Sequence, residues 1–72
     1  MKNLIKRAGP RDEIAAELGI CPRTITRWVS GERRPTWEHM VALMRRAGVV
    51  RVDVAADGTV ALIAWNGDEV RL

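Results

Sequence analysis

The chain has 72 residues, of which 47% are hydrophobic and 29% charged, with a net charge of +3, so we expect one small folded domain rather than a disordered chain or a multidomain enzyme. The single cysteine, Cys21, excludes an internal disulfide, and Cys21 with His39, the single histidine, cannot complete a four-ligand zinc site. No apolar run approaches the roughly 20 residues of a membrane span, and residues 1–7 lack the apolar stretch of a secretory signal, so we expect a cytoplasmic protein.

Up to Gly48 the hydrophobic residues recur at helical spacing and predict four short helices. We expect these helices over residues 2–8, 10–18, 22–30 and 37–47. Their boundaries follow from proline and glycine: proline tolerates a first turn, and glycine ends a helix in the left-handed conformation. Thr36 is a good N-cap for the fourth helix, whereas Cys21 is a poor one for the third.

The apolar side of each helix is expected to face the core. The residues in question are Leu4, Ile5, Ala8, Ile14, Ala15, Leu18, Ile25, Trp28, Val29, Trp37, Met40, Val41, Met44 and Ala47. We expect His39 on the surface, because it lies on the polar side of the fourth helix.

After Gly48 the hydrophobic residues alternate with polar ones, which predicts β-strands. A three-residue loop, Ala56-Asp57-Gly58, is expected to join the first two strands in a hairpin. That loop pairs Val54 with Val60 and Val52 with Leu62, and it places the stripe Val50/Val52/Val54 on the face of Leu62 and Ala64.

The opposite face of the hairpin then carries Ala61, Ile63 and Trp65. Asn66-Gly67 is a second turn signal, and a short third strand over residues 68–72 can pair back and place Val70 and Leu72 beside Ile63 and Ala61. The predicted fold class is α+β: a helical part over residues 1–48, followed by an antiparallel β-hairpin tail over residues 49–72.

The second and third predicted helices have the pattern of a helix-turn-helix, two short helices joined by a turn that contains glycine. Ala15 is small where the helices cross, Gly19 suits the left-handed turn, and Ile20 follows as an apolar plug. The inward positions of the motif are Ile14, Leu18, Ile25 and Trp28.

Residues 14–35 resemble the helix-turn-helix of the Cro and phage-repressor family. The characteristic end of that motif stands here as Trp28, Gly31, Arg33, Arg34 and Pro35. The resemblance covers roughly residues 2–48, and the tail is similar to Cro proteins in which a β-hairpin follows the helices. It implies a homodimer that binds an inverted repeat in double-stranded DNA and represses transcription.

The resemblance also implies which residues read the DNA, because the second motif helix enters the major groove by its N-terminal half. The base-reading positions are Pro22, Arg23, Thr26 and Arg27, with Ser30 at the far end. The chain departs from the family in having Pro22 where Gln or Ser is common and Cys21 where a polar N-cap is common. Direct reading should therefore depend mostly on Arg23 and Arg27.

The spacing of Arg23 and Arg27 supports this role independently, because residues four apart project from one face of a helix and a guanidinium can make two hydrogen bonds to guanine. The alternative is that both arginines are merely solvated, with Glu17 as an ion-pair partner for one of them. We expect phosphate contacts from Arg11, Thr24, Arg33 and Arg34.

The charge distribution agrees with DNA binding by the helical part. Residues 1–48 carry ten Lys and Arg against five Asp and Glu, whereas residues 49–72 carry two against four. We therefore interpret Lys2, Lys6 and Arg7 as general electrostatic attraction, and Arg45 and Arg46 as charges that suit the end of a helix.

The acidic tail is the expected dimer contact, either through its edge strand with Val50 and Val52 or through the face that carries Ile63 and Trp65. For Trp65, burial in the core and packing on a third strand stay open beside the dimer contact, and Trp37 is expected to lie in the core or beneath the hairpin. Two other functions stay open: a phage excisionase or similar architectural DNA-binding factor, and an antitoxin-like module that binds a protein partner. We find no catalytic, cofactor or metal constellation and do not expect an enzyme.

Overall fold

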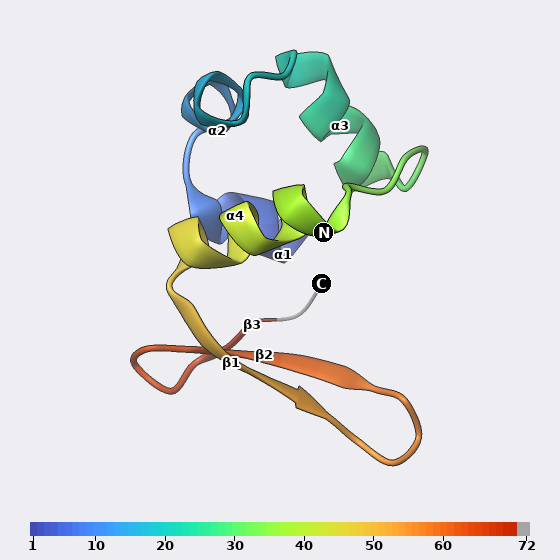
Figure 1. The fold of residues 1–72 in the computed structure, drawn as a ribbon, viewed down its shortest axis with the longest axis vertical. Coiled ribbons are helices and arrows are strands. Elements are labelled where there is room, and N and C mark those ends of the chain that lie inside the picture. The colour runs from blue at the N-terminus through green and yellow to red at the C-terminus, as the bar shows by residue number, and fades with distance from the viewer. Residues whose placement is uncertain (71–72) are drawn as a thin grey trace.

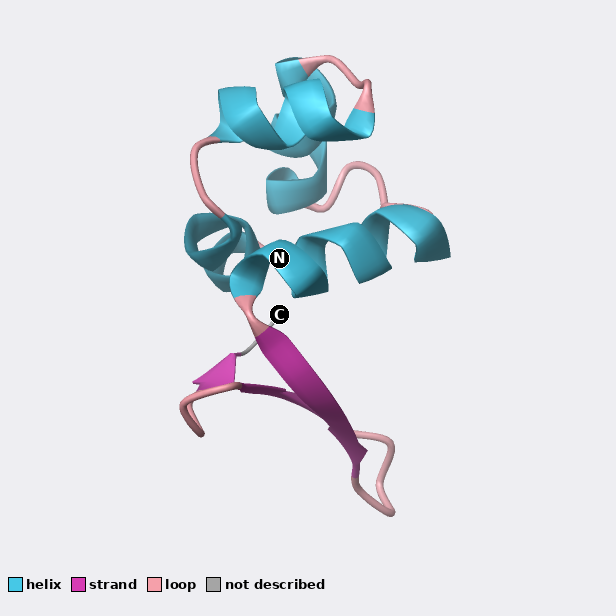
Figure 2. Ribbon diagram, turned by 60° about the vertical axis from the view of Figure 1, so that its left-hand side comes forward, coloured by secondary structure: helices cyan, strands magenta, loops and turns pink. Residues whose placement is uncertain are grey.

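The computed structural model describes residues 1–70, and four helices precede a three-stranded antiparallel sheet (Figure 1). The helices are α1 (Lys2–Ala8), α2 (Arg11–Leu18), α3 (Pro22–Ser30) and α4 (Trp37–Ala47), and the strands are β1 (Val49–Val54), β2 (Val60–Ala64) and β3 (Glu69–Val70). This is the predicted α+β arrangement. The hairpin extends away from the helices, which Figure 2 shows from a second side.

The helix ends follow the local chemistry that the sequence predicts. Pro22 occupies the first turn of α3, and Cys21 before it makes no side-chain cap. The Thr36 hydroxyl accepts a hydrogen bond from the backbone N–H of His39 at 3.3 Å and caps α4. Gly48 ends α4 at φ 79°, in the left-handed conformation that the turn into β1 requires.

One hydrophobic core joins the helical part to the sheet. Its buried residues are Leu4, Ile5, Ala8, Ile14, Ala15, Ile25, Trp28, Leu43, Ala47, Leu62, Ala64 and Val70. Residues 1–48 and 49–70 are thus consecutive in sequence but share the same packed interior, so neither part has a core of its own among the described residues.

The inward side of α4 differs from the prediction. Trp37, expected in the core, is 72% exposed, whereas Leu43, which was not expected there, is fully buried. Leu43 and Ala47 lie on the buried side of α4. Trp37 lies outside this side of the helix, so it is not covered by the core. Trp37 is also the first residue of α4, where the chain enters from an exposed loop.

The hairpin register agrees with the prediction at its outer end. Val54 lies opposite Val60 and Val52 opposite Leu62. The Ala55 N–H donates to the Thr59 carbonyl at 2.8 Å, and Gly58 has φ 89°, as the three-residue loop requires.

Closer to the helices, a bulge changes the predicted alternation. The register shifts between Val49 and Arg51, so Val49 rather than Val50 lies opposite Ala64. Val50 is therefore not part of a continuous stripe with Val52 and Val54, and the prediction that it shares their face with Ala64 was wrong.

The third strand forms, but its register is one residue away from the prediction. Val70 lies opposite Leu62 and Glu69 opposite Ile63, whereas the sequence was interpreted as placing Val70 beside Ile63. The observed register directs Val70 to the face of Leu62 and buries it in the core, which stabilises this pairing. The prediction for Leu72 lies outside the described residues.

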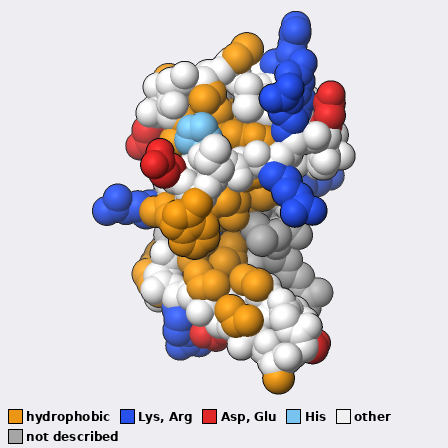
Figure 3. Space-filling view, turned by 45° about the vertical axis from the view of Figure 1, so that its right-hand side comes forward, with side chains coloured by type: hydrophobic (Ala, Val, Ile, Leu, Met, Phe, Trp, Pro, Cys, Tyr) orange, Lys and Arg blue, Asp and Glu red, His pale blue; other side chains and the backbone are white. Residues whose placement is uncertain are grey.

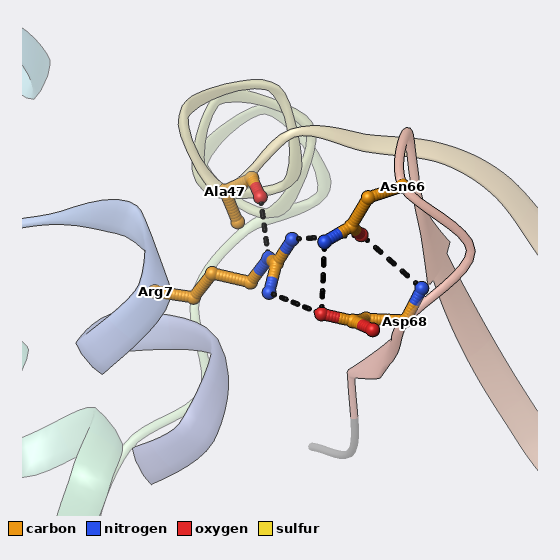
Figure 4. A network of polar contacts seen from close by, with 4 residues as sticks. All are labelled: Arg7, Ala47, Asn66 and Asp68. Atoms are coloured by element: carbon orange, nitrogen blue, oxygen red, sulfur yellow. Dashed lines mark hydrogen bonds and ion pairs between the residues drawn. The ribbon is translucent and has the colours of Figure 1, made fainter.

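Two arginines connect elements of the fold, although the sequence predicts only general electrostatic attraction for Arg7 and a helix-end charge for Arg46. Arg7 donates from Nε to the carbonyl of Ala47 at 2.8 Å and reaches Asn66 and Asp68 in the turn between β2 and β3 (Figure 4). It therefore joins α1, the end of α4 and the sheet.

Arg46 has a similar role between α4, α1 and α2. Its Nε donates to the carbonyl of Ala8 at 3.1 Å, and its Nη1 and Nη2 lie 3.1 Å from Glu17 and 3.6 Å from Glu13. Glu17 is thus paired with α4 and not with an arginine of α3, so it is not the partner that the solvated alternative for Arg23 and Arg27 proposed.

Candidate nucleic-acid interface

The helix-turn-helix predicted from residues 11–30 is formed by α2 and α3. Gly19 stands at φ 67°, and the N–H of Ile20 donates back to the carbonyl of Ala15 at 3.0 Å, which closes the turn. Ile25 and Trp28 hold the inner side of α3, because both are buried in the core. His39 packs on Trp28 with a ring separation of 5.5 Å and is half-buried, so it is less exposed than predicted.

The outer side of α3 is open. Pro22, Arg23, Thr26 and Ser30 are exposed, and the side chain of Arg27 is 38% exposed. Thr24 is half-buried. The structure therefore places the predicted base-reading residues on the side of α3 that faces away from Ile25 and Trp28.

The two arginines of this side differ in their surroundings. Within residues 1–70, Arg23 forms no ion pair, so its guanidinium is free to meet a ligand. Arg27 lies 4.0 Å from Glu32, at the outer limit of an ion pair and with both groups partly solvated. Such a contact is weak, because solvent screens it.

Ser30 uses its hydroxyl locally. Its Oγ donates to the carbonyl of Arg27 at 3.0 Å and accepts from the N–H of Glu32 at 3.4 Å. This satisfies the C-terminal end of α3 and leaves Ser30 less suited to base reading than Arg23 or Thr26.

The residues predicted to contact phosphates lie around α3. Arg11 is the first residue of α2, and its Nη1 donates to the Oγ1 of Thr26 on α3 at 3.1 Å. Arg33 and Arg34 are exposed in the loop that follows α3. Arg34 also lines a shallow apolar hollow with Met1, Pro35 and Met40. Figure 3 shows Lys and Arg side chains standing out from the helical part of the molecule.

A basic hollow at the junction of α1 and α2 was not predicted as a site. It is lined by Lys2, Ile5, Lys6, Gly9, Pro10 and Arg11. Because Arg11 also contacts α3, this hollow continues the basic surface from α3 toward α1. Lys2 and Lys6 are four residues apart and so lie on one face of α1. This spacing is the sequence signal from which the basic hollow could have been predicted.

The residues predicted for the dimer contact lie in the strands and in the turn after β2, and they differ in exposure. Val50 and Trp65 are 69% and 75% exposed, Val52 is less so, and Ile63 is half-buried. Trp65 is therefore not a core residue; its N–H donates to the carbonyl of Gly48 at 2.9 Å. Figure 3 shows hydrophobic side chains continuing from the middle of the molecule over the strands.

Within the described part of the chain, no three acidic, His or Cys residues gather as metal ligands, and no helix has the length and apolarity to cross a membrane. The chain matches no protein-family model, no curated protein and no solved structure. The candidate interface is therefore defined by its own geometry, the arginine-bearing outer side of α3 in a helix-turn-helix.

Proposed function

We propose that this protein is a sequence-specific regulator of transcription that binds double-stranded DNA. It acts as a homodimer on an inverted repeat, represses the genes next to it, and works in the cytoplasm of a bacterial or phage-infected cell. The observation that carries the proposal is the two-sided character of α3: Ile25 and Trp28 are buried, while Arg23, Thr26 and Arg27 line the outer side.

A helix with one anchored and one open side suits the major groove, which admits an α-helix and displays a distinct donor and acceptor pattern for each base pair. Arg23 and Arg27 lie one turn apart on α3, and each is suited to a two-bond contact with guanine. Arg11, Arg33 and Arg34 surround this helix and supply contacts to phosphates, which fix position rather than sequence.

A homodimer is part of the proposal because one α3 reads only about half a site. Two such helices related by a two-fold axis read half-sites roughly 34 Å apart, one turn of DNA. The hairpin offers two surfaces for this contact: the edge strand with Val50 and Val52, and the opposite face with Ile63, next to Trp65 in the turn after β2.

The hairpin tip favours a repressor over an architectural factor that inserts a basic wing into the minor groove. The loop Ala56-Asp57-Gly58 carries a carboxylate and no cation, and the Asp57 Oδ1 accepts a hydrogen bond from the Thr59 N–H at 2.9 Å. A negatively charged tip is repelled by phosphates.

Selection of bound duplexes from a random library tests the proposal. We expect enrichment of a symmetric sequence with two guanine-containing half-sites whose centres are about one helical turn apart. Direct tandem repeats with bent DNA would indicate the architectural factor instead. Failure to enrich any sequence at moderate ionic strength, with a folded protein by circular dichroism, would overturn the proposal.

A further inference from the structure

The basic hollow between α1 and α2 has the size and the charge of a small-molecule site. Its volume is about 550 Å³, within the range of roughly 300–1,000 Å³ that pockets for small ligands have. The residues that line it are Lys2, Ile5, Lys6, Gly9, Pro10 and Arg11. Half of them are cations and none is a carboxylate, so the hollow concentrates positive potential and is suited to an anion.

The fold makes little use of these cations. Within residues 1–70, Lys2 and Lys6 form neither an ion pair nor a side-chain hydrogen bond. The Arg11 guanidinium donates to Thr26 and makes no other bond in this part of the chain. Lys2 and Lys6 also lie four residues apart on α1, where like charges destabilise a helix. An anion held between them removes this repulsion.

The number of cations indicates a ligand with more than one phosphate. A single phosphate monoester carries a charge of about −1.5 to −2 at pH 7, which leaves part of the charge of Lys2, Lys6 and Arg11 uncompensated. A diphosphate or triphosphate group balances it. Both side-chain types suit this ligand, because the guanidinium forms paired hydrogen bonds with phosphate oxygens and the ammonium groups act as point charges.

The rest of the lining is apolar and suits the body of a nucleoside. Ile5, Gly9 and Pro10 form this part of the hollow, and Pro10 is exposed there. Small-molecule sites commonly combine apolar walls with a few charged groups that fix the orientation of the ligand. A nucleoside polyphosphate therefore matches both halves of the hollow better than a bare anion does.

Arg11 connects the hollow to the candidate DNA interface. Its Nη1 donates to Thr26 on the outer side of α3 at 3.1 Å, and the proposed function assigns it a contact to a DNA phosphate. An anion in the hollow competes with DNA for this guanidinium and adds negative charge beside α3. Because such coupling is reciprocal, bound DNA must weaken binding of the anion by the same factor.

We propose that the hollow between α1 and α2 binds a nucleoside polyphosphate through Lys2, Lys6 and Arg11, and that the bound nucleotide weakens DNA binding by α3. The effect on DNA rests on the proposed function, whereas nucleotide binding is tested on the free chain. Phosphates of a DNA backbone share the chemistry of the ligand, so the experiments separate the two sources.

Calorimetric titration of the full chain with ATP, without divalent cations and at constant ionic strength, gives the first test. We expect ATP to bind more tightly than AMP and than inorganic tripolyphosphate, and adenosine not to bind. Lys2→Gln and Lys6→Gln should each weaken ATP binding by about fivefold or more, because each removes a charged contact. Arg45→Gln is the matched control on the exposed side of α4 and should change it by less than about twofold.

Two outcomes of this titration would overturn the proposal. Equal losses in the three glutamine variants would show that ATP responds only to net charge. Equal affinity for ATP and tripolyphosphate would remove the nucleoside from the assignment. Backbone amide shifts in NMR spectra locate the ligand: the largest should occur at Ile5, Gly9 and Arg11, and larger shifts at Arg33 and Arg34 would place ATP outside the hollow.

Operator binding in the presence of ATP tests the coupling. Saturating ATP at constant ionic strength should raise the Kd for the duplex enriched by selection by about fivefold or more in the wild type and in Arg45→Gln. In Lys6→Gln the effect should fall below about twofold. An unchanged Kd in the wild type would refute the coupling.

The remaining outcomes distinguish the two sources of phosphate. If Lys6→Gln weakens operator binding and lowers its salt dependence while the wild type binds no ATP, the hollow holds a DNA phosphate and the nucleotide proposal is wrong. If the chain binds ATP in the hollow but enriches no duplex, the nucleotide site stands and the proposed function fails.

Discussion

Arg11 and Thr26 are joined across the helix-turn-helix by a hydrogen bond of 3.1 Å from Nη1 to Oγ1. This contact links the first residue of α2, a predicted phosphate contact, to the middle of the outer side of α3, a predicted base-reading position. The Thr26 hydroxyl accepts this bond and keeps its own proton to donate to DNA. The two residues thus form one polar unit that joins the start of α2 to the middle of the candidate interface.

Replacement of Arg27 by alanine tests base reading. We expect Arg27→Ala to weaken binding to the selected operator by about 1–3 kcal/mol more than binding to random duplex, because the lost contact distinguishes guanine from other bases. Fluorescence anisotropy with both DNAs at one salt concentration measures the difference. Equal losses on the two DNAs would contradict a base-reading role.

Replacement of Arg33 by alanine tests a phosphate contact. Arg33 is exposed in the loop after α3, so Arg33→Ala should weaken binding to operator and random DNA about equally and reduce the slope of log K against log salt by roughly one. Arg45→Ala is the matched control, since Arg45 is an exposed arginine on α4. If both variants change the slope by the same amount, Arg33 has no specific phosphate contact.

Arg46 should contribute to the stability of the fold. Arg46→Gln removes the ion pairs to Glu13 and Glu17 and disturbs the hydrogen bond to the carbonyl of Ala8. We expect a loss of about 1–2 kcal/mol in the free energy of unfolding, measured by urea titration. Arg45→Gln should change it by less than about 0.5 kcal/mol, and a similar loss in both variants would show that Arg46 acts only through its charge.

Gly48 links α4 to β1, and the structure predicts that alanine is poorly tolerated there. Gly48 has φ 79°, and an added Cβ would lie 2.8 Å from Cδ1 of Trp65. The backbone conformation alone costs about 1–2 kcal/mol for alanine, and the contact with Trp65 adds to it.

A double-mutant cycle separates the two costs of Gly48→Ala. In a Trp65→Ala background the steric contact is absent and only the backbone cost remains. The destabilisation by Gly48→Ala should therefore be smaller in that background than in the wild type, by thermal unfolding. An equal effect in both backgrounds would show that Trp65 moves aside freely.

The hairpin loop should respond to acid. The backbone N–H of Thr59 donates to the Asp57 carboxylate, and this bond lowers the pKa of Asp57 below its ordinary value of 3.8. Since the folded pKa is depressed, the ionised group stabilises the loop above pH 3.8 and this contribution is lost as the pH falls through the lowered pKa.

A carboxyl titration by NMR measures this effect. The Asp57 midpoint should lie below that of a short peptide with the same loop sequence, and the Thr59 amide shift should follow the same titration. In Asp57→Asn the side chain still accepts the bond but does not titrate, so the pH response of Thr59 should disappear. A midpoint equal to that of the peptide would contradict the hydrogen bond.

Much of the fold could be predicted from the sequence, because its determinants are local. Proline and glycine set the helix boundaries, Thr36 caps α4 as expected, and Gly58 fixes the length of the hairpin loop and with it the pairing of Val54 with Val60. The outer side of α3 is also a local property, since Arg23 and Arg27 are placed by helical periodicity once Ile25 and Trp28 are buried.

What the sequence did not determine depends on contacts between distant residues. The sequence predicts no partner for Arg7 or Arg46. Their partners, Ala47 and Asp68 for Arg7 and Ala8 and Glu17 for Arg46, come near only when α1, α2, α4 and the sheet pack together. Trp37 was expected in the core because helical spacing predicts which side of the helix a residue faces. It does not predict whether another element covers that side at the first residue of the helix, and Trp37 is exposed. The register of β3 was decided by the burial of Val70, since strand pairing alone allows either face and the shared core stabilises only one.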